Sequence, residues 1–378
     1  MNENQLQMMN VFGVKGVGFM KEVVFTGFPG FIASQLIRTI IKKENSVSAI
    51  VLATEMEKAK KEADEIQRLT DSGPIRLMAG DITKDRLGLN DEDTAYLKGK
   101  EVAFWHLAAL YDLAVPREIA WKVNVEGTRN VNRFVSELPH LLRYMYFSTA
   151  YVAGDREGTL YEDELIRPEN FKNFYEETKF QAELLVEELK ETCPVTIIRP
   201  GIVRGNSETG ETIKFDGPYF FLNMIDRLRK LPFIPYIGRS AAFINVVPID
   251  YILKASVYLS EHDEAEGKTV HLTDPNPHPI EEVYRKMVQE KTGKTPKLRL
   301  PHTVAAFSLK SVTLQRFLGV EAETLDYLTW NAHFDTANAQ QLLAGSEIHC
   351  ADFLETIPTM VKFYELHKFN KKFHVKIG

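Results

Sequence analysis

Short β-branched runs alternate with longer helical patterns through the first half of this chain, and this alternation limits the folds open to it. The strand-like runs lie near residues 23–25, 49–52, 75–79, 102–106, 143–148 and 195–199. Helical patterns separate them near residues 31–43, 55–70, 117–137 and 174–191. Strands that alternate with helices form βαβ units with right-handed crossovers. The order predicts an α/β fold with a doubly wound parallel sheet of about six strands.

The turn after the first strand-like run suits a dinucleotide pyrophosphate. It reads Thr26-Gly27-Phe28-Pro29-Gly30-Phe31-Ile32-Ala33. In such turns one glycine permits the sharp bend, a second lets the backbone approach the phosphates, and a small third residue lets the next helix pack closely. Gly27, Gly30 and Ala33 have this spacing, so the N–H groups of the following helix would face the anion. The turn predicts a Rossmann-type cofactor site.

The residues after the second strand-like run bear on the choice between NADP and NAD. An acid at that strand end binds the ribose 2′-hydroxyl of NAD, whereas a basic side chain suits the 2′-phosphate of NADP. Leu52-Ala53-Thr54 places no acid directly at the strand end, and Lys58, Lys60 and Lys61 follow Glu55. The lysines equally fit a solvated helix face. NADP is therefore the preferred cofactor, and NAD is the alternative.

Three tyrosine–lysine pairs have the spacing of one helical turn: Tyr96/Lys100, Tyr175/Lys179 and Tyr364/Lys368. The first and third pairs lie on polar segments and are expected at the surface. Tyr175 instead lies between the strand-like run that ends in Ser148-Thr149 and the next such run. Its helix is therefore expected to bring the pair to the carboxyl edge of the sheet.

The chemistry of such a pair is proton transfer at a carbonyl oxygen. A free tyrosine has a pKa of about 10, too high for efficient proton transfer at neutral pH. A lysine one turn away lies on the same helix face and favours the phenolate. Tyr175 would then give a proton to the substrate oxygen as hydride reaches the carbon. Thr149 would hold that oxygen, and Ser148 is the alternative hydroxyl.

With these motifs, residues 20–290 resemble an extended short-chain dehydrogenase/reductase. Thr26–Ala33 resembles the cofactor loop of that family, and Gly80-Asp81-Ile82 its adenine-contacting segment. His106-Leu107-Ala108-Ala109 is similar to the loop after its fourth strand. Asn124 matches a further position of the family, and Thr149, Tyr175 and Lys179 match its catalytic triad. Arg199-Pro200-Gly201 matches the loop beside the nicotinamide.

The resemblance implies an NAD(P)-dependent oxidoreductase, and a homodimer built through a helix pair would be usual for the family. The cofactor-binding residues that it implies are Gly27, Phe28, Pro29, Gly30, Phe31, Ile32, Asp81, Ile82, Leu107, Ala108, Ala109, Asn124, Tyr175, Lys179, Pro200, Gly201 and Val203.

A narrower resemblance lies in Gly80-Asp81-Ile82-Thr83-Lys84-Asp85-Arg86-Leu87-Gly88-Leu89. This segment is similar to the G-D-x-x-x-x-x-L-G-L signature of the thioester-reductase and fatty acyl-CoA reductase branch. Phe334-Asp335-Thr336-Ala337-Asn338 is also compatible with that branch. The resemblance implies reduction of an acyl thioester or long-chain carbonyl by NADPH, to an aldehyde or alcohol. The arginine that often follows strand 2 in that branch is missing here.

Three other functions remain open because a fold does not determine the chemistry of its site. One is a hydroxysteroid-like alcohol dehydrogenase or carbonyl reductase. Another is a sugar-nucleotide epimerase or dehydratase that retains NAD. The third is a non-catalytic dinucleotide sensor, which would fit a chain that lacked Thr149, Tyr175 or Lys179.

The sequence pattern changes after Gly201, where a second region begins. Residues 218–236 are rich in Phe, Leu, Ile and Pro, and they fit either an apolar substrate cap or an amphipathic helix packed on the core. Residues 242–247 are strand-like and are expected to return to the sheet, and 268–272 offers a further strand. The expected division is a disordered extension at 1–19, a dinucleotide-binding domain at 20–200 with a return near 242–258, and a substrate-binding cap with a helical C-terminal region at 201–241 and 259–378.

Charge and composition argue against several other classes of protein. The net charge of −6 gives no indication of nucleic-acid binding, which would need a basic stripe. Cys193 and Cys350 are too few for a disulfide framework or a zinc site, so no metal is expected and a cytoplasmic location with reduced thiols is favoured. No apolar run reaches the roughly 18 residues that span a bilayer, and no signal peptide is expected.

Overall fold

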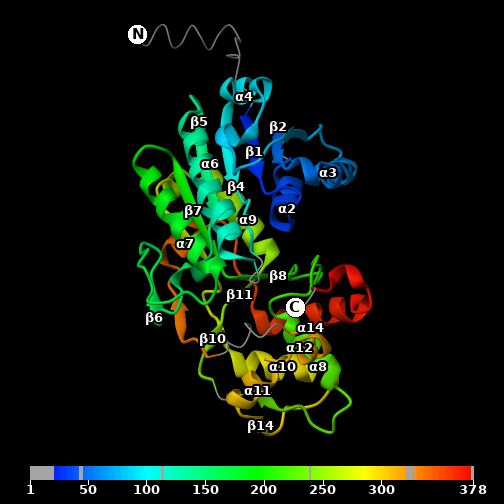
Figure 1. The fold of residues 1–378 in the computed structure, drawn as a ribbon. Coiled ribbons are helices and arrows are strands. Elements are labelled where there is room, and N and C mark those ends of the chain that lie inside the picture. Colours follow the sequence, from blue (N-terminus) through cyan, green and yellow to red (C-terminus); the bar gives the residue numbers. More distant parts are fainter. Residues whose placement is uncertain are drawn as a thin grey trace.

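The computed structural model describes residues 21–41, 46–111, 115–237, 240–320, 327 and 329–375. The extension expected at residues 1–19 therefore lies outside the described residues. In Figure 1 a sheet with helices on both faces forms one part of the molecule, and α8, α10, α12 and α14 gather in another. Among the described residues, no helix is both long enough and apolar enough to cross a membrane.

A seven-stranded parallel sheet forms the centre of the fold. Its order is β12-β7-β5-β4-β1-β2-β3, and every neighbouring pair is parallel. The order reverses between β1 and β4, which places a ligand crevice beyond the carboxyl ends of these strands. The strand bounds are β1 Lys21–Thr26, β2 Ser46–Val51, β3 Arg76–Ala79, β4 Glu101–His106, β5 Leu141–Phe147, β7 Val195–Pro200 and β12 Thr269–Leu272.

Successive residues of the strands point to opposite faces of the sheet and pack under different helices. Val23 and Phe25 of β1 share a core with α2, α3 and α9, whereas Val24 lies in a core with α4, α6 and α7. Both faces are covered, as expected for strands with near-continuous apolar runs. The helices of this part are α2 Phe31–Ile40, α3 Met56–Thr70, α4 Asp91–Lys98, α5 Arg117–Trp121, the π-helical turn η4 Lys122–Glu126, α6 Gly127–Ser136, α7 Phe174–Glu187 and α9 Ile249–Glu261.

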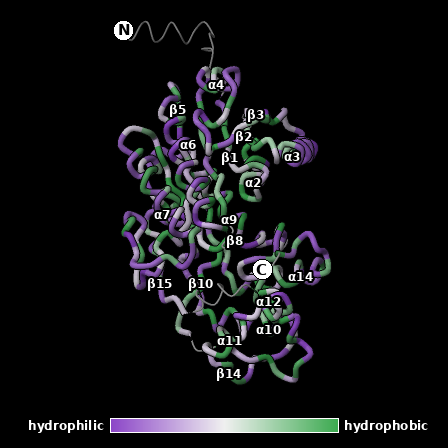
Figure 2. Tube along the Cα trace, in the orientation of Figure 1, coloured by the Kyte–Doolittle hydropathy of each residue, from purple (hydrophilic) through white to green (hydrophobic). Residues whose placement is uncertain are grey.

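Short 3₁₀ turns occur at η2 Ala53–Glu55, η3 Asp85–Gly88, η5 Ala150–Ala153, η6 Glu188–Glu191, η7 Asp263–Ala265 and η9 Lys371–Phe373. The hydrophilic colouring of α3 in Figure 2 agrees with its few buried residues, Ala59, Ala63 and Ile66. These features, together with the seven strands, confirm the predicted α/β doubly wound fold. The expected strands and helices of the first half all occur within a few residues of their predicted bounds.

A second hydrophobic core holds the C-terminal helices together. It is built mainly from α8 Tyr219–Leu228, α10 Ile280–Thr292 and α14 Phe353–His367. Tyr219, Phe220, Phe221 and Leu222 are all buried in it, as expected for an amphipathic helix packed on a core. The smaller helices are α11 His302–Ser308, α12 Val312–Leu318 and α13 Ala337–Leu342.

The expectation that residues 242–247 rejoin the main sheet is wrong. They form two short strands on either side of Asn245, whose side-chain amide is bonded to the backbone of Asp274. It is α9 that returns to the sheet face, and residues 269–272 add the seventh strand. The two-stranded ladders pair β8 Ile202–Arg204 with β11 Val246–Pro248, β10 Phe243–Ile244 with β13 His278–Pro279, β9 Tyr236–Ile237 with β14 Arg299–Leu300, and β6 Gly158–Leu160 with β15 Ala332–Phe334.

Candidate active site

The glycine turn joins β1 to α2 with the backbone exposed to a ligand. Gly27 has a φ of +87°, and a Cβ on it would lie 2.8 Å from the backbone nitrogen of Ala108. The Gly30 N–H donates to the Gly27 carbonyl at 2.7 Å and closes the turn. No side chain caps the start of α2, so its first N–H groups remain available to an anion. The turn therefore fits a dinucleotide pyrophosphate.

The other residues of the turn have different surroundings. Phe28 and Ala33 are buried in the core under α2, where the small Ala33 allows the close packing that its position predicts. Pro29 is partly exposed and Gly30 is exposed. Phe31 and Ile32 are partly buried and pack against the same core.

A buried histidine ties the glycine turn to the loop after β4. His106 Nδ1 lies 2.7 Å from Thr26 Oγ1, and His106 Nε2 lies 3.1 Å from Thr128 Oγ1. The N–H groups of Leu107 and Ala108 also donate to Thr26 Oγ1, each at 3.2 Å. Burial lowers the pKa of His106 to about 3, so the ring is neutral. The sequence analysis placed Thr26 in the cofactor loop, but it predicted neither the role of its hydroxyl nor that of Thr128.

The predicted cofactor residues Asp81 and Ile82 lie in a tight loop after β3. The Asp81 N–H donates to the Leu87 carbonyl at 2.7 Å, and the Asp81 carboxylate accepts from Thr83. Leu87 has a φ of +58° and is fully buried, so the loop conformation is held by packing of the leucines of this segment. Ile82 packs against Gly127, where a Cβ would lie 2.8 Å from the Ile82 side chain.

Asn124 joins the loop after β4 to α7. Its Oδ1 accepts from the Leu110 N–H at 2.8 Å, and its Nδ2 donates to the Leu110 carbonyl at 3.0 Å. The same Nδ2 lies 2.9 Å from Thr178 Oγ1 on α7. The segment that contains Leu107, Ala108 and Ala109 is thus held at both ends. Asn124 acts on this loop and on α7 through hydrogen bonds within the protein.

The structure brings the predicted triad together at the carboxyl edge of β5. Thr149 follows β5 directly, and Tyr175 lies in the first turn of α7, where it is half-buried and hydrogen-bonded to Thr149. Lys179 is buried one turn later; its Nζ donates to the Phe147 carbonyl at 2.6 Å and lies 3.0 Å from Tyr146 Oη. The alternative hydroxyl, Ser148, points to Glu183 instead.

The ionisation of the pair differs from the expectation. Burial raises the pKa of Tyr175 to about 12, and the hydrogen bond with Thr149 offsets this only in part. Burial lowers the pKa of Lys179 to about 7, opposed by the nearby carboxylate of Glu183. The phenolate predicted from the sequence is therefore not favoured. Desolvation outweighs the attraction that the helical spacing suggested.

A buried ion pair lies behind the triad, and sequence reasoning missed it. Arg199 Nη2 lies 2.6 Å from Glu183 Oε1, and both side chains are almost fully buried. Ser148 donates to the other oxygen of Glu183. Arg199 Nη1 also lies 3.1 Å from His271 Nε2 on β12. Glu183 follows Lys179 by one helical turn, a spacing that could have indicated it.

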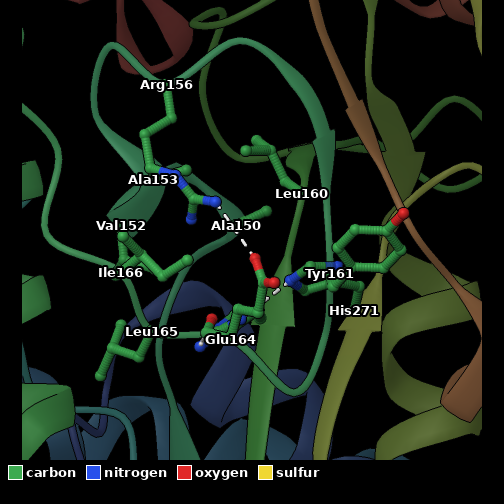
Figure 3. Close-up of a pocket in the computed structure, with 11 residues that line it drawn as sticks. Ala150, Val152, Ala153, Arg156, Leu160, Tyr161, Glu164, Leu165, Ile166 and His271 are labelled. Carbon is green, nitrogen blue, oxygen red and sulfur yellow. Dashed lines mark hydrogen bonds and ion pairs between the residues drawn. The ribbon is translucent and has the colours of Figure 1, made fainter.

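Figure 3 shows a small hollow beside this network. Residues of η5 and the segment after it line the hollow, together with Arg199 and His271. Arg156 and Glu164 face each other across it, and their charged atoms are 3.1 Å apart. Part of the lining comes from η5, which begins directly after Thr149.

The nicotinamide loop predicted at residues 200–201 is also closely packed. The Gly201 N–H donates to the Leu272 carbonyl at 3.2 Å, and a Cβ on Gly201 would lie 2.7 Å from Asn245 Oδ1. Pro200 ends β7, and Val203 lies on β8. The loop therefore continues the same sheet edge on which the triad lies. Within the described residues, no group of three or more His, Cys, Asp or Glu side chains is placed to hold a metal ion.

The other two tyrosine–lysine pairs have structural contacts elsewhere. Tyr96 donates to Glu22 at 3.0 Å, near the amino end of β1. Tyr364, expected at the surface, is buried in the helical core and donates to Asn223 at 3.0 Å, so that expectation is wrong. A polar flanking sequence did not show that Tyr364 faces inward on α14.

The lysines after β2 are exposed on the outer face of α3. Lys58 Nζ lies 3.5 Å from Glu55, and Lys60 Nζ lies 3.0 Å from Glu57. These contacts match the solvated helix face that was the alternative interpretation. The predicted preference for NADP therefore lacks a basic side chain at the end of β2 that could bind the 2′-phosphate.

The fold and this site define an NAD(P)-dependent oxidoreductase of the extended short-chain dehydrogenase/reductase type. The family model described as "Male sterility protein", an NAD-binding family, matches residues 25–256. That match spans more than half of the chain, and the chain belongs to this family.

Known relatives of the chain include longer proteins. It is 26% identical over 308 residues to the non-canonical nonribosomal peptide synthetase cpsA of Aspergillus campestris, covering 75% of this chain and 29% of that protein. It is 21% identical over 306 residues to a putative fatty acyl-CoA reductase of Drosophila melanogaster, CG8303, covering 69% of this chain and 56% of that protein. The chain therefore spans less than two thirds of each.

A solved structure extends the likeness to almost the whole chain. The terminal R domain of the myxalamid PKS-NRPS pathway has a TM-score of 0.80 and 25% identity, and the match covers 94% of this chain and 93% of that one. Epimerases of known structure share the fold at lower identity, which shows the fold alone. The likeness to the R domain includes the C-terminal helices as well as the sheet.

Proposed function

We propose that the enzyme reduces an acyl thioester with NADPH, with Tyr175 as the proton donor. The main supporting observation is that Thr149, Tyr175 and Lys179 gather at the same carboxyl edge of the sheet at which the uncapped start of α2 lies. The likeness to a terminal R domain over nearly the full chain supports the reaction type. The fatty acyl-CoA reductase relative supports an apolar acyl group.

The proposed cofactor site follows the sheet edge. Gly27, Gly30 and the start of α2 would hold the pyrophosphate, and Asp81 with Ile82 would contact the adenosine. The remaining proposed contacts toward the ribose and nicotinamide are Leu107, Ala108, Ala109, Asn124, Tyr175, Lys179, Pro200, Gly201 and Val203. The cofactor supplies hydride to the carbonyl carbon. No basic side chain lies at the end of β2 to bind a 2′-phosphate. The use of NADPH rather than NADH is therefore itself part of the proposal.

The proposed chemistry uses Tyr175 in its neutral form. Because burial raises the pKa of Tyr175 to about 12, the phenol carries its proton at neutral pH and can donate it to the carbonyl oxygen. Thr149 would donate a hydrogen bond to the same oxygen. The carbon–sulfur bond then breaks, the thiol leaves with a proton, and an aldehyde remains. Lys179, with a pKa of about 7, would return a proton to Tyr175 between turnovers.

The first test is loss of 340 nm absorbance with palmitoyl-CoA and either NADPH or NADH, alongside decanal in place of the thioester. We expect oxidation of NADPH with the thioester. Oxidation with decanal alone would instead identify a carbonyl reductase. Tight NAD retained through purification, with no oxidation in either assay, would favour an epimerase or dehydratase.

The matched variants are Tyr175→Phe and Tyr96→Phe. Tyr96 has the same spacing to a lysine but contacts Glu22 away from the site. We expect Tyr175→Phe to lose about a hundredfold or more of the turnover, as is typical when a general acid is removed, while cofactor binding persists. Tyr96→Phe should keep full turnover. Equal turnover of both variants would remove Tyr175 from the mechanism.

The proposed enzyme is located in the cytoplasm and forms a homodimer. Cys193 and Cys350 are both free thiols in the structure, which supports a cytoplasmic location. A homodimer, usual for the resembled family, stays a prediction that light scattering of the purified chain would test.

A further inference from the structure

One end of the helical region exposes large apolar side chains. In Figure 1, β14 and α11 lie at the end of the molecule far from the sheet. The set, here called the apolar tip, is Leu231 (45% exposed), Phe233 (41%), Leu298 (67%), Val304 (46%), Phe307 (76%), Val312 (44%) and Phe317 (56%).

The segments that carry the apolar tip are joined to one another by hydrogen bonds and strand pairing. Lys294 Nζ donates to the carbonyls of Arg229 and Leu231, each at 2.7 Å, so the loop after α8 lies against the segment before β14. β14 pairs with β9 and leads directly into α11. α12 is joined to α8 by the 3.1 Å bond from Asn223 to the Gly319 carbonyl.

The exposure of these side chains is built into the local structure. Val304 and Phe307 are three residues apart on α11 and share one face. α12 buries none of its residues, although it carries Val312, Leu314, Phe317 and Leu318. Leu298 has a φ of +62°, a conformation that non-glycine residues seldom adopt, and its side chain is two-thirds exposed.

Basic residues accompany the apolar tip, in a chain whose net charge is −6. Residues 227–237 and 291–320 contain no aspartate or glutamate; the next acids, Glu321 and Glu323, lie outside the described residues. Arg229 and Arg299 pair with Asp226 and Glu281 at the edge of the surface. The basic residues of the two segments are Arg227, Arg229, Lys230, Lys291, Lys294, Lys297, Arg299, Lys310 and Arg316, of which Lys291 is buried and pairs with Asp226 and Glu365.

Bases and apolar side chains alternate within this surface. Lys230 precedes Leu231, Lys297 precedes Leu298, and Arg316 precedes Phe317. A lipid layer offers anionic head groups above apolar chains, so a surface that carries both basic and apolar side chains is complementary to an anionic membrane. A protein partner would instead favour a continuous apolar centre with charges at its rim.

We propose that the apolar tip docks on an anionic membrane surface, with Leu298, Phe307 and Phe317 inserted at the boundary between head groups and acyl chains. Apolar insertion and attraction to anionic lipids both strengthen such binding. The proposal goes beyond the reductase function and does not depend on it. It describes peripheral contact, which requires no membrane-spanning helix.

The test is flotation of the full chain with vesicles of phosphatidylcholine alone or of phosphatidylcholine with phosphatidylglycerol. We expect binding to the anionic vesicles only. Leu298→Ser with Phe307→Ser should lower the partition coefficient about tenfold or more, since several buried CH₂-sized groups are lost. Leu69→Ser, at a site 59% exposed on α3, is the matched control and should bind like the wild type.

Variants that reverse the charge of basic residues test the electrostatic contribution to membrane binding. Each basic residue near an anionic surface strengthens binding about fivefold, so Lys297→Glu with Arg316→Glu should abolish flotation. Lys58→Glu on α3 should leave it unchanged. Thermal unfolding of every variant will show whether it is folded. Phe307→Trp gives a second readout, because its emission should shift to shorter wavelength on anionic vesicles.

Three results would overturn the proposal. One is failure of the wild type to float with anionic vesicles. Another is equal binding of the folded tip variants and the wild type. The third is a Phe307-dependent complex with an acidic acyl carrier protein and no binding to vesicles, which would assign the surface to protein docking.

Discussion

Desolvation determines the charge of the ionisable side chains in the triad. Tyr175 is kept neutral and Lys179 is brought close to half-protonation at neutral pH. A neutral phenol is a suitable donor to a carbonyl oxygen, and an amine with a pKa near ambient pH can exchange protons readily. The shift at Lys179 also has a consequence for stability that can be measured without substrate.

The free energy of unfolding should rise with pH because of Lys179. Its pKa is about 7 in the folded protein and 10.5 ordinarily, so between these values the unfolded chain binds more protons. The contribution is at most about 1.4 kcal/mol per pH unit. Urea unfolding at about pH 7 and about pH 9 should therefore show a steeper rise for the wild type than for Lys179→Met. Equal slopes would place the lysine pKa outside this window.

Gly27→Ala should abolish cofactor binding. The residue has a φ of +87°, and a Cβ would collide with the Ala108 nitrogen at 2.8 Å, so the turn must shift. The left-handed conformation costs alanine about 1–2 kcal/mol in addition. Gly73→Ala is the control, because a Cβ there meets nothing within 4 Å. Calorimetric titration with NADPH should show binding for the control only; binding by both variants would mean that the turn tolerates a side chain.

At the scale of elements, the Glu183–Arg199 pair joins α7 to β7 beneath the triad. Removing one partner of a buried ion pair leaves the other uncompensated and costs about 3–5 kcal/mol. Glu183→Gln should therefore lower the free energy of unfolding strongly, and adding Arg199→Met should restore part of the loss. Urea unfolding of the three proteins measures this. A double variant no more stable than the single one would show that the ion pair is not the main interaction.

The sequence was sufficient to predict those elements whose pattern is confined to a short stretch of the chain. The strands of the main sheet, the glycine turn and Thr149, Tyr175 and Lys179 all carry short-range signals. Glu183 and Arg199 are distant in the chain and become partners only when α7 packs on β7. Residues 242–247 read as a sheet strand, yet the bonds of Asn245 to Asp274 hold them in small ladders. Burial, which decides the two triad pKa values, depends on the same long-range packing.

At the scale of the whole molecule, the helical region has a hydrophobic core separate from those of the sheet. Phe215 is fully buried in it, among the rings of Tyr219, Tyr364 and Phe373. Phe215→Ala should lower the free energy of unfolding by about 3–5 kcal/mol and still bind NADPH when folded. Phe369→Ala, at an 85% exposed site, should change stability by less than about 0.5 kcal/mol. Loss of NADPH binding by the folded Phe215→Ala protein would show that the two regions depend on each other.

The buried histidine between Thr26 and Thr128 has a further consequence for the cofactor edge. Thr26 Oγ1 already accepts two backbone N–H groups, so its own hydrogen must go to His106 Nδ1. The ring must then carry its hydrogen on Nε2 and give it to Thr128, whose hydroxyl donates to the Asn124 carbonyl at 2.6 Å. A single tautomer is therefore imposed. The side-chain hydrogen bonds that run from Thr26 through His106 and Thr128 to the Asn124 carbonyl therefore all point the same way, which leaves this edge of the site with one fixed polarity.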